Sequence, residues 1–163
     1  MEINIYAILV AALIPIIVGF VWYNPKTFGS AWMREAEMTE EKMKTGNMPV
    51  IFIVSFILSF LLSFFVQFIT IHQTGALGMV GGDLTKALPS YTAFMADYGD
   101  AFRTFKHGAL HGTMAGILLV LPVIAVNGLF ERKSWKYILI NAGFWTVCLA
   151  IMGGIVCGWR YGF

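Results

Sequence analysis

Charged side chains are scarce in this sequence. Asp, Glu, Lys and Arg make up only 12% of its 163 residues, whereas a typical soluble domain contains about 25%. Hydrophobic residues make up 58%, and the mean hydropathy is +0.75. A soluble domain of this length has too little interior to hide so much apolar surface, so lipid is the expected solvent. The sequence also lacks the basic cluster typical of nucleic-acid binding, and we expect no nucleic-acid partner.

Several motifs that carry chemistry are absent as well. The sequence has no nucleophile–base set, no phosphate-binding loop and no His-Glu-x-x-His signature. Between their ends, the long apolar runs contain no Asp, Glu, Lys or Arg, although proton-coupled carriers usually keep an ionisable group at membrane depth. These absences weigh against an enzyme and against a proton-coupled exporter.

Four apolar runs each have the roughly 20 residues that a membrane-spanning helix needs. They cover residues 3–23, 49–71, 107–130 and 136–159. We therefore predict an all-α membrane protein, a single four-span bundle over residues 1–163. Pro15 and Pro122 lie within the first and third runs and should kink those helices. Aromatic residues at helical spacing predict an interfacial amphipathic helix over about 91–105.

The distribution of basic residues predicts the orientation. Four spans place both chain ends on one side of the membrane. The loops after the first and third spans carry seven basic residues: Lys26, Arg34, Lys42, Lys44, Arg132, Lys133 and Lys136. The other side carries four: Lys86, Arg103, Lys106 and Arg160. Because cytoplasmic loops are enriched in Lys and Arg, both termini are expected outside the cytoplasm.

Two stripes of small residues recur every four positions, a spacing that lets membrane helices approach closely. One lies on the second span and one on the third: Ser55, Ser59 and Ser63, and Gly108, Gly112 and Gly116. A four-helix bundle needs about one such seam internally, which leaves the other for a second copy or another membrane protein. The first hypothesis is a non-catalytic, helix-packing or accessory subunit that forms homo- or hetero-oligomers. The alternative is a transporter or channel whose small solute follows the serine stripe.

The three histidines form the candidate site. His107 and His111 are four residues apart and share a helix face, and His72 closes the second span. The predicted topology puts all three at the outer membrane face. Such a set suits zinc or a similar divalent metal, and it also suits pH sensing. If the amphipathic helix runs on into the third span, Asp100 shares the histidine face and Asp97 lies near its edge. Otherwise these are ordinary interfacial residues and no cofactor is expected.

Several segments are similar to a known family. They are Ala12-Leu13-Ile14-Pro15, Gly19 to Lys26 (which includes Trp22-Tyr23-Asn24-Pro25), Phe28-Gly29, Trp32-Met33, Met38 to Glu41, His111-Gly112 and Phe130 to Ser134. They resemble the bacterial membrane family called domain of unknown function 1761. The resemblance implies a small four-span, multi-pass protein of the bacterial inner membrane. It implies no activity and no functional residues.

Overall fold

The computed structural model describes residues 3–160, and every regular element in that range is helical. Four helical segments are long and apolar enough to cross a membrane: α1 (Ile5–Trp22), α4 (Met48–Thr70), the segment Phe105–Phe130 and α9 (Trp135–Gly158). The four-span prediction is therefore confirmed, and each segment ends within two residues of its predicted bound. The predicted single domain over 1–163 extends at both ends beyond the described residues.

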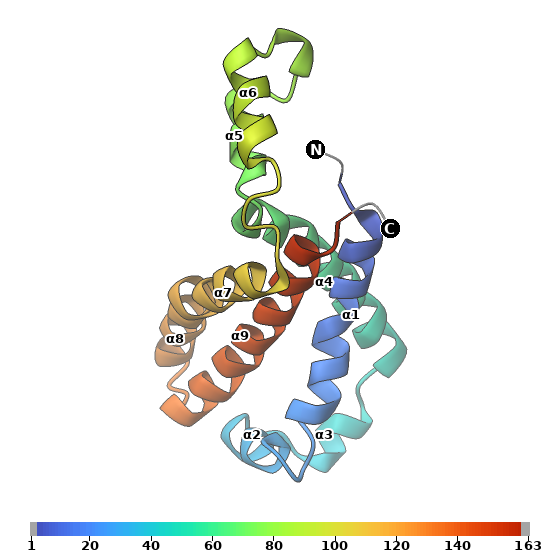
Figure 1. The fold of residues 1–163 in the computed structure, drawn as a ribbon. Coiled ribbons are helices and arrows are strands. Elements are labelled where there is room, and N and C mark those ends of the chain that lie inside the picture. Colours follow the sequence, from blue (N-terminus) through green and yellow to red (C-terminus); the bar gives the residue numbers. More distant parts are fainter. Residues whose placement is uncertain (1–2, 161–163) are drawn as a thin grey trace.

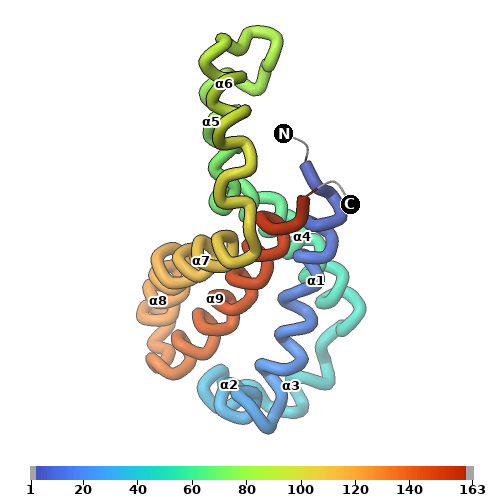
Figure 2. The backbone as a smooth tube through the Cα atoms, viewed as in Figure 1, coloured from blue at the N-terminus to red at the C-terminus, as the bar shows by residue number. Residues whose placement is uncertain are grey.

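Helix α9 lies at the centre of the bundle (Figures 1 and 2). It packs against α1 and α4 on one side, and against α7 (Phe105–Ala115) and α8 (Leu121–Phe130) on the other. The short helices α2 (Gly29–Glu35) and α3 (Glu40–Lys44) lie at one end. Helices α5 (Gln73–Met79) and α6 (Pro89–Tyr98) form an arm at the other end, where both ends of the described chain lie (Figure 1).

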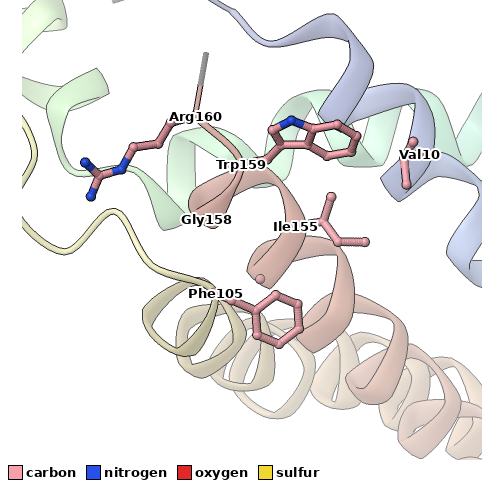
Figure 3. A pocket seen from close by; sticks show the side chains of 7 residues that line it. Val10, Phe105, Ile155, Gly158, Trp159 and Arg160 are labelled. Atoms are coloured by element: carbon pink, nitrogen blue, oxygen red, sulfur yellow. The ribbon is translucent and has the colours of Figure 1, made fainter. Parts of the chain in front are cut away.

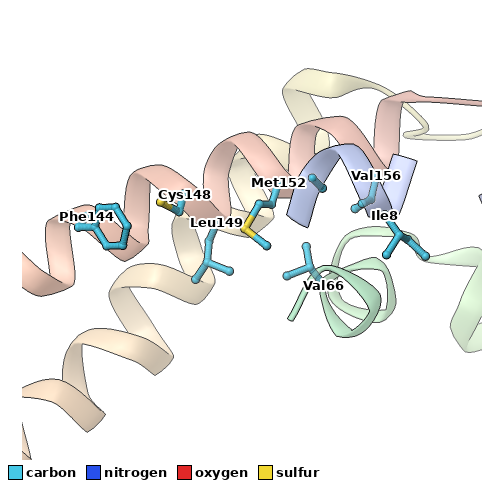
Figure 4. Packing of buried hydrophobic residues seen from close by; sticks show 8 residues of the cluster. Ile8, Val66, Phe144, Cys148, Leu149, Met152 and Val156 are labelled. Carbon is cyan, nitrogen blue, oxygen red and sulfur yellow. The ribbon is translucent and has the colours of Figure 1, made fainter. Parts of the chain in front are cut away.

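The buried core is apolar and is built around α9. Phe144, Cys148, Leu149, Met152 and Val156 from this helix meet Ile8 of α1 and Val66 of α4 (Figure 4). Large apolar side chains also face outward; Leu61 of α4 and Leu118 of the third span are 57% and 69% exposed. An outer surface of this kind fits a bilayer, where lipid replaces water as the solvent.

The glycine stripe packs within the chain, against α9. A Cβ atom on Gly108 would lie 2.0 Å from the carbonyl oxygen of Gly153, and one on Gly112 would lie 2.0 Å from that of Leu149. At Gly116 the added atom would meet Thr146 at 2.6 Å. The backbone of residues 108–116 therefore lies too close to α9 for any side chain larger than hydrogen at these three positions.

The serine stripe also faces the interior. Ser59 and Ser63 are 3% and 0% exposed, and Ser55 is half-buried. The Ser63 hydroxyl donates to the carbonyl oxygen of Ser59 within its own helix, at 2.8 Å. Both seams thus pack inside one chain. Association with a second copy or another membrane protein stays a prediction.

The two prolines are accommodated differently. Helix α1 runs through Pro15, which is buried. Pro122 follows a π-helical stretch, η2 (Gly116–Val120), that joins α7 to α8. Proline lacks an N–H and its ring clashes with the carbonyl four residues earlier. In a π-helix each hydrogen bond spans five residues, one more than in an α-helix. This wider turn lies directly before the segment in which the Pro122 ring would clash.

The amphipathic helix is shorter than predicted. Helix α6 ends at Tyr98, whereas the spacing of aromatic residues predicts a helix to about residue 105. Phe102 adopts a left-handed backbone conformation with φ 62°, and the Thr104 hydroxyl caps α7 by accepting from the N–H of His107. Residues 99–104 are therefore a loop, and α6 does not continue into the third span.

At the opposite end, Ser134 connects α9 to α2. Its hydroxyl accepts from the N–H of Tyr137 at 3.1 Å and donates to the Glu35 carboxylate at 2.7 Å. We expect Ser134→Ala to lower the free energy of unfolding by about 1 kcal/mol, the usual effect of losing an N-cap. Thermal unfolding in detergent measures the change. Ser134→Thr should retain most of the stability, and equal stability of the alanine variant would contradict the capping role.

The hydrogen bond from Ser134 to Glu35 predicts that the stability of the fold depends on pH. The hydrogen bond from Ser134, with the nearby Arg34 guanidinium, lowers the pKa of Glu35 from its ordinary value of 4.5. A carboxylate with a lowered pKa stabilises the fold above its unfolded-state pKa, and that stabilisation is lost as the pH falls through the folded-state pKa. The unfolding temperature should therefore drop less below pH 4.5 in Glu35→Gln than in the native chain. Identical pH profiles would contradict this assignment.

Candidate metal centre

Three histidines come together where the arm joins the bundle. His72 lies between α4 and α5, where the chain turns directly after the second span. His107 and His111 lie one turn apart near the start of α7. Two elements separated by more than 30 residues of sequence therefore contribute side chains to one cluster.

The imidazole nitrogens of the cluster lie close together. One ring nitrogen from each of the three histidines lies within 4.8 Å of the other two. The Nε2 atoms of His72 and His107 are 2.9 Å apart, so one of the two rings donates a hydrogen bond and the other accepts it. Tetrahedral zinc with bonds of 2.0–2.1 Å holds its nitrogen ligands about 3.3 Å apart. The three nitrogens, which lie within 4.8 Å of one another, are therefore spaced on the scale that one shared zinc ion requires.

The surroundings fix the rings in place. The Phe102 ring packs against His107 and His72, with centroid distances of 5.0 Å and 5.9 Å. Gly108 and Gly112, next to the two histidines of α7, press their own backbone against α9. His72 is exposed while His107 and His111 are half-buried. Packing against α9 and Phe102 thus surrounds the cluster, while His72 remains exposed.

The two aspartates are not part of the cluster. The Asp100 carboxylate lies 3.1 Å from the guanidinium of Arg160, and Asp97 is exposed on α6. The expected face shared by Asp100, His107 and His111 required an unbroken helix. The loop at Phe102 removes that helix, so the predicted addition of a carboxylate to the site is wrong for the geometry seen here.

Gln73 and Phe102 belong to the surroundings of the site, and neither was predicted from the sequence. Gln73 is only 5% exposed, and its amide nitrogen donates to the carbonyl oxygens of Tyr98 and Ala101 at 3.0 and 2.9 Å. These bonds hold α6 and the following loop beside His72. The position of Gln73 next to His72 in the chain was the only available signal, and Phe102 gave none.

A separate hollow lies along the C-terminal half of α9 (Figure 3). It has a volume of about 620 Å³ and is lined mainly by apolar side chains, among them Val10, Phe105, Ile155 and Trp159. The single cation on its rim, Arg160, points away from these side chains (Figure 3). Arg160 is already engaged by the Asp100 carboxylate and the Arg103 carbonyl oxygen.

A family model described as "Protein of unknown function (DUF1761)" matches residues 6–157. The chain belongs to this family. The resemblance inferred from the sequence is therefore confirmed, and the DUF1761 domain contains all three histidines and both seams of small residues. No curated protein and no solved structure matches the chain.

Proposed function

We propose that this multi-pass membrane protein binds one divalent transition metal ion, zinc or a similar ion, through His72, His107 and His111. The observation that supports this proposal is the convergence of three imidazole nitrogens within 4.8 Å from two separate elements. Imidazole suits zinc, copper, nickel and iron. Three protein ligands would leave the fourth tetrahedral position of the ion open, as in catalytic zinc sites.

The proposal places the metal on the outer side of a bacterial inner membrane. The cluster lies at the same end of the bundle as both ends of the described chain (Figure 1). The basic residues are concentrated at the opposite end, and the positive-inside rule assigns that end to the cytoplasm. The site would then draw its metal from outside the cytoplasm.

The other hypotheses rest on weaker support. Self-association or an accessory role stays a prediction. Both small-residue seams pack within the chain, so neither of them supports a contact with a partner. Passage of a solute along the serine stripe also stays a prediction, since Ser59 and Ser63 are buried in the packing of α4.

Metal content tests the proposed function. The protein is purified in mild detergent through a tag without histidine, equilibrated with zinc and passed over a desalting column. We expect one zinc per chain, and none in a variant that carries both His107→Ala and His111→Ala. Asp97→Asn is the matched control and should keep its zinc, because Asp97 lies outside the cluster. Absence of stoichiometric zinc from the native chain would overturn the proposal.

A further inference from the structure

A cavity of about 530 Å³ lies beside the histidine cluster, between the two helices of the arm. Its walls include the aromatic rings of Phe94, Tyr98 and Phe102, and its remaining lining is mostly small, with Ala76 and Ala101. A volume of this size lies within the range of small-molecule sites. Flat rings on the walls favour a flat apolar occupant, because aromatic rings stack on one another.

The cavity and the histidine cluster share two residues. His72 lines the cavity and contributes a nitrogen to the cluster. Phe102 also lines the cavity, and its ring packs on His72 and His107. Phe102 holds a left-handed conformation that is costly for a residue with a side chain, and such conformations concentrate at ligand-binding sites. A molecule in the cavity is therefore within reach of a metal at the cluster.

Gln73 adds a polar group to the cavity wall. Its amide nitrogen is used by two backbone carbonyls, while its carbonyl oxygen is buried and has no hydrogen-bond partner. Gln73 therefore ties α6 and the loop that follows it to α5, along the wall of the cavity.

We propose that the cavity holds a small organic molecule with a flat, largely apolar body and a nitrogen or oxygen head that occupies the open position of the metal. This inference rests on the proposed metal site and adds the class of its ligand. The apolar body would lie between Phe94, Tyr98 and Phe102, and the head would lie beside His72.

The test compares two azoles on the cobalt-loaded protein in lipid nanodiscs, since cobalt gives visible absorption bands and zinc does not. Imidazole supplies only the coordinating head, whereas 4-phenylimidazole adds a flat apolar body. We expect both azoles to change the cobalt bands, and 4-phenylimidazole to bind at least about 10-fold more tightly because its phenyl ring leaves water.

Two cavity variants should remove this preference. Ala76→Phe fills the cavity and Phe94→Ala removes one wall. Each variant should bind 4-phenylimidazole with an affinity close to that for imidazole. Before any azole is added, the cobalt spectrum of each variant should equal that of the native chain. Ala96→Phe, on an exposed position of α6, is the matched control and should keep the native preference. A native chain without cobalt bands would overturn the metal site together with this inference. Cobalt bands with equal affinities, or a preference unchanged in both cavity variants, would overturn the inference alone.

Discussion

Substitution of His111 with alanine is expected to lower the affinity for zinc by at least about 100-fold. Loss of a partner that merely orients a ligand already costs 10- to 100-fold in many metal sites, and His111 would be a ligand itself. Its ring lies 4.5 Å from that of His107 and 5.1 Å from that of His72, between centroids. Competition against a chromophoric chelator measures the change.

Further variants distinguish the ligands of the proposed site from residues that only lie near it. His72→Ala should weaken zinc binding as strongly as His111→Ala, although His72 comes from a different element. Zinc at 100 times its dissociation constant should stabilise the native chain by about 2.7 kcal/mol, and this increment should disappear in both variants. Asp97→Asn should behave like the native chain. Unchanged affinity in His72→Ala would show that the two elements do not share an ion.

Gly112→Ala is expected to destabilise the bundle by about 3 kcal/mol or more. The added Cβ would lie 2.0 Å from the carbonyl oxygen of Leu149 and 2.9 Å from the Cα of Ala150. Both are backbone atoms of α9, so α7 and α9 would have to move apart along the seam. Overpacking of a well-packed core costs about 1–3 kcal/mol, and occasionally more when backbones must shift. Thermal unfolding and the yield of folded protein report the effect.

Gly75→Ala is the matched control for this prediction. Gly75 lies in α5, and a Cβ there would meet nothing within 4 Å. Alanine favours a helix over glycine by about 1 kcal/mol, so this variant should be as stable as the native chain or slightly more stable. Equal stability of Gly112→Ala and Gly75→Ala would show that α7 and α9 do not approach as closely as the glycine seam indicates.

The spans were predictable because lipid imposes a simple rule. A helix that crosses the hydrocarbon needs about 20 apolar residues whose backbone groups pair within the segment. The sequence meets this rule four times, and hydropathy alone placed the four segments. The small-residue spacing identified seams on α4 and α7, but a spacing does not identify the helix that packs against it. Only the contacts of Gly108, Gly112 and Gly116 show that α9 is the helix that packs against the glycine seam.

The histidine cluster was predictable in part. The four-residue spacing of His107 and His111 places them on one helix face, and the topology brings His72 to the same end of the bundle. The expected helix through Asp97 and Asp100 was wrong because the break at residues 99–104 contains no proline. The turn instead uses the left-handed Phe102 and the cap by Thr104. The cavity beside His72 depends on this loop and could not be inferred from spacing.

X-ray absorption at the zinc edge tests the central claim most directly. The native chain, loaded with one equivalent of zinc, should give a first shell of nitrogen and oxygen at 2.0–2.1 Å, the distances typical of zinc–histidine sites. The outer-shell scattering should correspond to three imidazoles, from His72, His107 and His111. A shell of oxygen alone, fewer than two imidazoles, or sulfur at about 2.3 Å from a cysteine thiolate would contradict the proposed site.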